Sequence, residues 1–151
     1  LLEFERGAGI FSPRLRSQLK RVAEALPAIP KHRDDLPNIH RKFGEVNADL
    51  DTFEWLEMRT MAALPAGGNP GPIASILKLR ASRLKQAIGE MGVDALGAES
   101  LRWRSSSVRG GVASRQAQTL VPEYFNSRAF TIFGGAAEIQ LCIIPKTVLG
   151  V

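Results

Sequence analysis

The chain has 151 residues, of which 44% are hydrophobic, 23% charged and 7% aromatic, so it can form one domain with its own core but has few side chains that suit an all-β core. Its formal net charge is +5, but the basic residues are interleaved with acidic ones, which disfavours a nucleic-acid partner because scattered Lys and Arg usually form a solvated surface. No run approaches the roughly 20 apolar residues that cross a bilayer, so no membrane span is expected.

A first helix is predicted over residues 1–26. Its apolar positions are Leu1, Leu2, Phe4, Leu15, Leu19, Val22, Ala23 and Leu26. Gly7, Gly9 and the pair Ser12-Pro13 interrupt this pattern, which predicts a bend or a close-packed region near the start of the helix. Pro27 and Pro30 end it, because proline has no amide donor to continue the helix.

The second and third helices are predicted over residues 36–64 and 72–96. Apolar residues three and four apart predict the seam of an antiparallel bundle in the second helix: Leu36, Ile39, Phe43, Val46, Leu50 and Phe53. Pro72 suits the first turn of the third helix, and Gly97 suits its C-terminal cap. The inward positions of the third helix are predicted to be Ile73, Ile76 or Leu77, Leu84, Ile88, Met91 and Ala95. Met58, Met61 and Met91 are interpreted as residues that fill gaps in the core.

The remaining segment contains a basic loop over residues 98–114 and two more helices. A helix over residues 115–133 is predicted to turn Leu120, Val121, Tyr124, Phe125, Ala129 and Ile132 inward. Gly134 and Gly135 permit a sharp reversal, after which Ile139, Ile143 and Val148 or Leu149 predict an apolar stripe on a short final helix. Five helices and no convincing strand predict an all-α fold, an up-down helical bundle, as a single domain over residues 1–151.

Three further features concern the setting of the chain. Cys142 is its only cysteine and cannot form an internal disulfide, and no secretory leader precedes the first helix, so a cytoplasmic location is expected. His32 and His40 lack the spacing of metal ligands, so no metal site is expected. The chain starts at Leu1, inside an apolar pattern, and we therefore expect it to be a C-terminal fragment of a longer protein.

The segment from Asn126 to Val151 carries the most specific motif. It contains Ile132-Phe133-Gly134-Gly135, Glu138-Ile139-Gln140, Ile143-Ile144 and Val148-Leu149-Gly150 in order. This series resembles the C-terminal end of acyl-CoA dehydrogenases, in which I-[FY]-[GE]-G-T-x-E-I-Q joins the last two helices. The stretch from Gly71 to Leu79 resembles that family's small-residue turn followed by S-x-x-K, and Leu2-Glu3-Phe4-Glu5-Arg6 resembles its L-x-x-E-R helix.

The resemblance implies the C-terminal helical domain of an FAD-dependent acyl-CoA dehydrogenase, inactive without the other domains of its parent. In this family a carboxylate removes the α-proton of an acyl-CoA thioester while the β-hydride passes to flavin. One family position for this base corresponds to Gly134, which has no acid group, and the other corresponds to Glu5. The resemblance therefore implies Glu5 as the catalytic base. The alternative from the residues themselves is a surface acid paired with Arg6.

Further roles follow from the same resemblance. Arg6 and Gly135 are expected to bind the substrate. The residues expected to contact FAD are Ala136, Ala137, Glu138 and Ile139. For Glu138 the alternative is an acid favoured by the dipole of the final helix.

The resemblance also implies partners, and it leaves two other functions open. The implied partners are an acyl-CoA substrate, an electron-transfer flavoprotein as electron acceptor, and either further copies of the chain or a heteromeric partner subunit. Ala136 stands where the family usually has Thr, which favours a non-catalytic assembly subunit as one alternative. The other alternative is an unrelated helical interaction domain that uses the basic loop.

Overall fold

The computed structural model describes residues 10–64, 71–101 and 112–149, and within these residues it contains five α-helices and no strand. The helices are α2 (Ser12–Ala25), α3 (Leu36–Ala63), α4 (Pro72–Leu96), α5 (Val112–Ser127) and α6 (Ala137–Leu149). Short 3-10 helices follow three of them: η1 (Leu26–Ala28), η2 (Gly97–Leu101) and η3 (Arg128–Thr131). The predicted all-α fold is confirmed.

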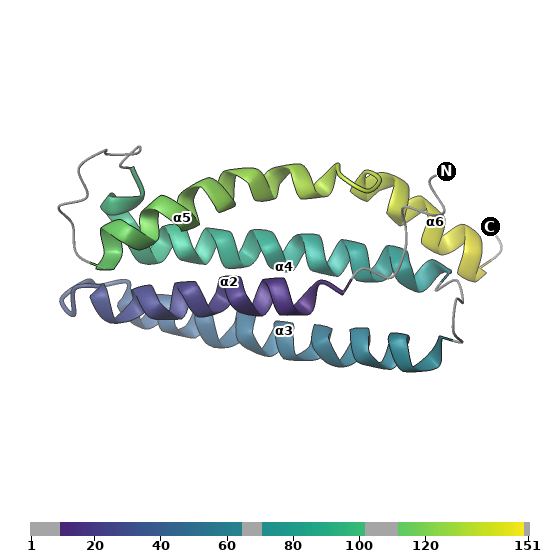
Figure 1. Ribbon diagram of the computed structural model, residues 1–151, viewed down its shortest axis with the longest axis horizontal. Helices are drawn as coiled ribbons and strands as arrows, with labels where there is room; N and C mark the ends of the chain where they lie inside the picture. The colour runs from purple at the N-terminus through teal and green to yellow at the C-terminus, as the bar shows by residue number, and fades with distance from the viewer. Residues whose placement is uncertain (1–9, 65–70, 102–111, 150–151) are drawn as a thin grey trace.

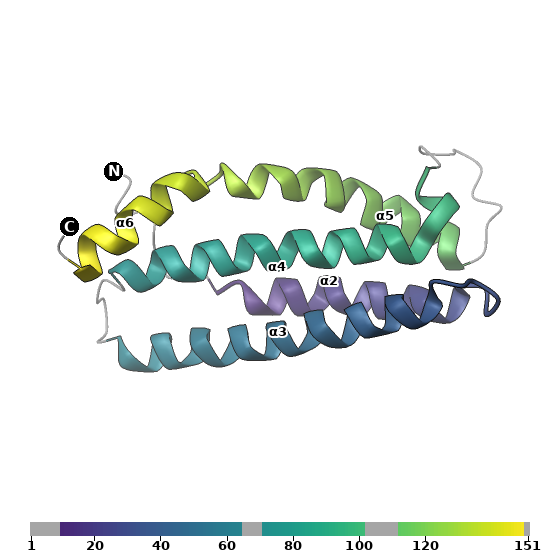
Figure 2. The ribbon, with the colours of Figure 1, turned by 180° about the vertical axis from the view of Figure 1, so that it is seen from behind.

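Helices α2 to α5 run up and down side by side along the long axis of the molecule, and α6 lies beyond the end of α5 (Figures 1 and 2). Helix α4 is central, because it packs against α2, α3, α5 and α6. Its sequence explains this position, since buried apolar or small residues occur on several sides of the helix, as in Leu79, Leu84, Gly89 and Gly92.

The main core lies between these helices, and the predicted seam of α3 contributes to it. Within the seam, Ile39, Leu50 and Phe53 are buried, whereas Phe43 and Val46 are partly buried against the core. The other large buried side chains include Val22, Ile88, Met91 and Leu120. The seam prediction is therefore confirmed along most of its length. No helix in the described part of the chain is both long and apolar enough to span a membrane.

The two ends of α4 lie where the local sequence predicts, but the start of α2 does not. Pro72 lies in the first turn of α4 and Gly97 caps its end with a φ of +54°, both as predicted. Ser12 and Pro13, however, begin α2 and do not interrupt it. The physical reason is that a proline in the first turn replaces an amide that has no helical acceptor anyway. Residues 1–9, and with them the predicted start of the first helix, lie outside the described part.

The predicted boundaries of the basic loop also change. Residues 97–101 form η2, and α5 begins at Val112, three residues before the predicted start. Residues 102–111, the middle of the predicted loop, lie outside the described part. The α-helix then ends at Ser127, followed by the tighter turn η3. This change of helical rotation explains why Ile132 is exposed and does not point inward as predicted.

Three more inward predictions are wrong. Phe125, Met58 and Met61 are exposed, whereas Met91 fills the core as predicted. Helices α3 and α5 lie at the outside of the bundle, where neighbours cover only one side of each. Each of these two helices has more apolar residues than its covered side can hold, so some apolar side chains remain on the surface. The inward prediction for Ile73, at the start of α4, is wrong as well, because its side chain is 40% exposed.

Candidate functional site at the start of the last helix

The turn before α6 depends on two glycines with unusual backbone angles. Gly134 has a φ of +66° and Gly135 a φ of +96°, values in the left-handed region that other residues rarely adopt. The next residue, Ala136, accepts the first helical hydrogen bond of α6 from the backbone N–H of Gln140, at 3.0 Å. The predicted turn at the Gly134-Gly135 hinge is therefore confirmed, but α6 continues beyond the end of α5, so the turn is a bend and not the predicted sharp reversal (Figure 1).

Lys78 of α4 forms a hydrogen bond with this turn. Its Nζ donates a hydrogen bond to the carbonyl oxygen of Gly135, at 2.6 Å. Burial lowers the pKa of Lys78, because an ammonium group loses hydration there, while the charge of Glu138 acts in the opposite direction. The site thus contains a partly desolvated cation directly beside the glycine turn.

Gln140 closes the turn from the other side. Its side chain is 1% exposed, and its Nε2 lies 3.3 Å from the carbonyl oxygen of Gly134. A Cβ atom at Gly135 would lie only 2.5 Å from this Nε2. Glycine at position 135 is therefore required by its backbone angle, and a larger residue would also have to displace the side-chain amide of Gln140.

Two further polar side chains of α4 bind the segment between α5 and α6. Ser82 Oγ lies 3.1 Å from the carbonyl oxygen of Phe130, and Gln86 Nε2 donates to the carbonyl oxygen of Ser127, at 3.2 Å. Lys78, Ser82 and Gln86 are four residues apart, so they share one face of α4. Lys78 and Gln86 supply donors for carbonyl groups where the chain leaves the α-helix, whereas the single hydroxyl proton of Ser82 is shared between the carbonyl oxygens of Phe130 and Lys78, the latter at 2.8 Å.

The structure places five of the predicted site residues together at the start of α6. Gly135, Ala136 and Ala137 are partly buried, and Glu138 is exposed in the first turn. Ile139 is 54% exposed, so its predicted burial in an apolar stripe is wrong. The reason is that α6 packs against α4 alone among the long helices. The side chains of Val148 and Leu149, and both Glu5 and Arg6, lie outside the described part.

The first turn of α6 has free capacity for hydrogen bonding. The first amides of an α-helix have no acceptor within that helix. Ala136 precedes the helix and carries only a methyl group, so it has no side-chain oxygen to accept from these amides. The helix dipole also favours negative charge at this end. Together with Lys78, the start of α6 suits an anionic or polar edge of a bound molecule.

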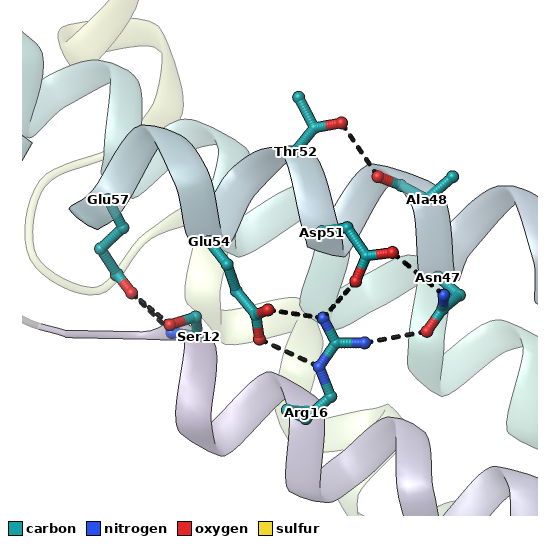
Figure 3. Close-up of polar contacts among 8 residues, drawn as sticks. All are labelled: Ser12, Arg16, Asn47, Ala48, Asp51, Thr52, Glu54 and Glu57. Atoms are coloured by element: carbon teal, nitrogen blue, oxygen red, sulfur yellow. Dashed lines mark hydrogen bonds and ion pairs between the residues drawn. The ribbon is translucent and has the colours of Figure 1, made fainter. Parts of the chain in front are cut away.

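A second polar arrangement joins α2 to α3 (Figure 3). Glu57 of α3 is 3% exposed and accepts hydrogen bonds from the backbone N–H of Phe11 at 2.7 Å and of Ser12 at 3.1 Å. The hydroxyl of Ser12 donates to the same carboxylate. Glu57 therefore caps the start of α2 from a neighbouring helix, and its oxygens are too fully engaged for it to act as a free base.

Arg16 extends this arrangement along α3. Its guanidinium group donates to Glu54 at 2.9 and 2.7 Å, to Asp51 at 2.6 Å and to Asn47 at 2.8 Å (Figure 3). The hydrogen bond with Glu54 is the largest cause of a raised pKa at Arg16. Because three residues from two turns of α3 bind one side chain of α2, the two helices are held in a single register.

Sequence reasoning missed the structural roles of Lys78, Gln140 and Glu57. Lys78 is the last residue of the S-x-x-K motif and Gln140 ends the E-I-Q motif, so the signals were present without an assigned partner. Glu57 follows the buried positions Leu50 and Phe53 at helical spacing, and an acid on an apolar face indicates a buried partner. Within the described residues, no group of His, Cys, Asp and Glu side chains could hold a metal ion.

Comparison with known protein families identifies a relationship. A family model described as "Acyl-CoA dehydrogenase, C-terminal domain" matches residues 20–149. This range contains the hinge, the start of α6 and Lys78. No curated protein sequence matches the chain.

Proposed function

Since the chain belongs to the acyl-CoA dehydrogenase C-terminal domain family, we propose that it is the C-terminal domain of a flavin-dependent enzyme that dehydrogenates an acyl-CoA thioester between its α and β carbons. The observation that carries this proposal is the hinge. Gly135 is locked between Lys78 and Gln140, which presents the first turn of α6 as a rigid surface for a bound molecule. In this proposal the other domains of the full-length parent complete the active site.

Glu5 is the proposed catalytic base. Its carboxylate removes the α-proton of the thioester, which requires a dry pocket that raises the pKa of the acid. Arg6 and Gly135 bind the substrate. The carbonyl oxygen of Gly135 already accepts a hydrogen bond from Lys78, so the backbone N–H of Gly135 is the group left for a substrate carbonyl.

FAD fits the donor groups at the start of α6. The amides that follow Ala136 have no side-chain cap from that residue, and Lys78 adds positive charge nearby, so a polar ring edge or a phosphate finds donors here. Ala136, Ala137, Glu138 and Ile139 would line that contact. When bound, FAD supplies the acceptor for the hydride that leaves the β-carbon.

The test uses the full-length parent. We expect it to purify with a bound yellow flavin whose visible absorbance falls when an acyl-CoA is added without oxygen. A matched sample with free coenzyme A should keep its colour. A parent that binds neither flavin nor acyl-CoA would contradict the proposal.

The second candidate is a non-catalytic assembly subunit of a heteromeric acyl-CoA dehydrogenase. Two residues favour it: Ala136 has no capping oxygen and Gly134 has no acid group. In this case the parent would copurify with a second, flavin-bearing subunit, and the complex would contain one flavin per pair of chains and not two. A flavin in every copy of the parent would exclude it.

We also propose that the chain associates with further copies of itself or with that partner subunit. In addition, we propose a cytoplasmic location and an electron-transfer flavoprotein as the electron acceptor. The face of α3 that carries Trp55, Met58 and Met61 supports association, because Trp55 is 71% exposed. Helix α4 is largely covered by its neighbours and contributes little to this surface. Light scattering should show oligomers for the native chain and monomers for Trp55→Glu.

A further inference from the structure

A cavity of about 530 Å³ opens between α2, α4 and α5, at the side of the bundle. Its volume lies within the range of small-molecule sites. The apolar part of its lining includes Phe11, Leu15, Ala81 and Phe130, and the polar part includes Gln18, Arg21, Lys85 and Glu123. These residues have no role in the function proposed above.

Gln18 supplies the first sign that this cavity is a binding site. Its side chain is 4% exposed and borders the cavity, yet its Nε2 has no hydrogen-bond partner in the described part of the chain. Buried polar groups in folded proteins almost always have a partner, because an unpaired donor loses its hydration without compensation. An acceptor atom in the cavity would supply the missing partner.

Lys85 supplies positive charge in the same cavity. Its Nζ lies 3.4 Å from the centroid of the Phe130 ring, so the ammonium group rests on an aromatic face. Burial lowers the pKa of Lys85, the charge of Glu123 acts against this and that of Arg14 adds to it. The buried ammonium group is thus incompletely balanced by the acids around it, and a bound anion would stabilise its charged form.

Glu123, the acid in the lining of the cavity, already forms an ion pair with Arg21. Nη2 of Arg21 lies 2.6 Å from both carboxylate oxygens of Glu123. Glu123 therefore neutralises Arg21 first, which leaves Lys85 and the exposed Arg14 as the cations of the lining that can meet a ligand. Nη1 of Arg21 lies 3.2 Å from Ser17 Oγ, whereas its buried Nε has no partner in the described part of the chain.

We propose that this cavity binds a small organic carboxylate with a short apolar body. One carboxylate oxygen accepts from Gln18 Nε2 and the other pairs with Lys85 Nζ, while the apolar body lies against Leu15 and Phe130. Lys85 rests on the Phe130 ring beside the apolar part of the lining, so a carboxylate that carries an apolar body suits the cavity better than a bare phosphate ion. This inference does not depend on flavin chemistry in the parent.

The test is calorimetric titration of the 151-residue chain with hexanoate, hexanol, hexylamine and inorganic phosphate. We expect hexanoate to bind and the neutral, cationic and phosphate probes to bind at least about tenfold more weakly. Gln18→Leu removes the donor at similar size and should weaken hexanoate binding at least about tenfold, and Lys85→Met should do the same. Lys20→Met, which changes an exposed lysine of α2, is the matched control and should bind hexanoate as the native chain does.

A second readout separates binding from folding. Gln18→Leu replaces an unpaired buried amide by an apolar group, so its melting temperature without ligand should equal or exceed that of the native chain. Equal binding of hexanol and hexanoate, tighter binding of phosphate, or unchanged hexanoate affinity in both variants would each overturn the proposal. Should Gln18→Leu fail to fold, Lys85→Met and the comparison of hexanoate with hexanol still decide the question.

Discussion

Lys78 of α4 and Gly135 of the hinge are 57 residues apart in sequence, and the lysine ammonium group donates a hydrogen bond of 2.6 Å to the glycine carbonyl oxygen. This contact links the central helix of the bundle to the only turn that leads into α6. On the other side of the turn, Gln140 Nε2 lies 3.3 Å from the carbonyl oxygen of Gly134, so both glycine carbonyl groups have a side-chain donor. The orientation of the proposed cofactor surface is therefore set by α4.

Lys78→Met tests this link. The variant keeps the apolar stem of the side chain but leaves the carbonyl group of Gly135 without its charged donor, so we expect a loss of about 1–3 kcal/mol in the free energy of unfolding. Hydrogen exchange of the α6 amides should accelerate more than that of α3. Lys20→Met, at an exposed position, should change neither quantity. Unchanged exchange in α6 for Lys78→Met would contradict the assigned role.

Glu57→Gln tests the cap of α2. An amide in place of the carboxylate presents one acceptor oxygen to Phe11 and Ser12 where there were two, so a buried donor loses its partner. We expect a loss of about 1–3 kcal/mol in the free energy of unfolding. Glu54→Gln, one turn earlier on α3, alters a partly exposed ion pair with Arg16 and should cost at most about 1 kcal/mol. Equal losses in urea unfolding would show that Glu57 has no special role.

The sequence predicts the fold well because helical spacing and caps are local signals. The seam from Ile39 to Phe53 and the caps at Pro72 and Gly97 depend on neighbours within a few residues. The hinge is equally local, because two adjacent glycines permit its backbone angles. The start of α2 is harder, since Ser12-Pro13 is typical of both an interruption and a helix start.

The contacts of the site could not be predicted in the same way. The partners Lys78 and Gly135, or Glu57 and Ser12, come from helices far apart in the chain, and only the packing of those helices brings them together. The exposure of Ile139 and Phe125 has the same origin. Periodicity shows which face of a helix is apolar, but it does not show whether another element covers that face.

Substitution of two helical glycines by alanine should change the free energy of unfolding in opposite directions. A Cβ at Gly44 of α3 would meet no heavy atom within 4 Å, so Gly44→Ala should stabilise the chain by about 1 kcal/mol through helix propensity. A Cβ at Gly89 of α4 would lie 3.3 Å from the backbone Cα of Tyr124, which cannot move aside as a side chain can. Gly89→Ala should therefore destabilise the chain by about 1–3 kcal/mol. Urea unfolding measures both, and a stabilising Gly89→Ala would contradict the close packing of α4 and α5.

The pKa values of Lys85 and Lys42 should be shifted in opposite directions from the ordinary lysine value of 10.5. Burial lowers the pKa of Lys85, and the hydrogen bond with Asp94 raises that of Lys42. In the window between the folded pKa of Lys85 and 10.5, the unfolded chain binds more protons at this residue, so its contribution to stability rises with pH. NMR titration should show Lys85 losing its proton first. Lys85→Met should reduce the rise of unfolding free energy with pH in this window, and an identical slope would count against the shift.

The last prediction concerns the proposed base in the full-length parent. Glu5→Gln keeps the shape of the side chain but cannot accept a proton, so turnover with acyl-CoA should fall by more than the roughly 100- to 10,000-fold typical of a removed general base, while flavin stays bound. A second change, Gly134→Glu, then offers a carboxylate from the hinge. A Cβ at Gly134 would meet no heavy atom within 4 Å, although its φ of +66° costs a side chain about 1–2 kcal/mol. Some turnover should therefore return with Gly134→Glu and not with the matched control Gly134→Gln, which carries the same strain without a base. Near-normal turnover of Glu5→Gln alone would instead make Glu5 a bystander and favour the assembly-subunit function.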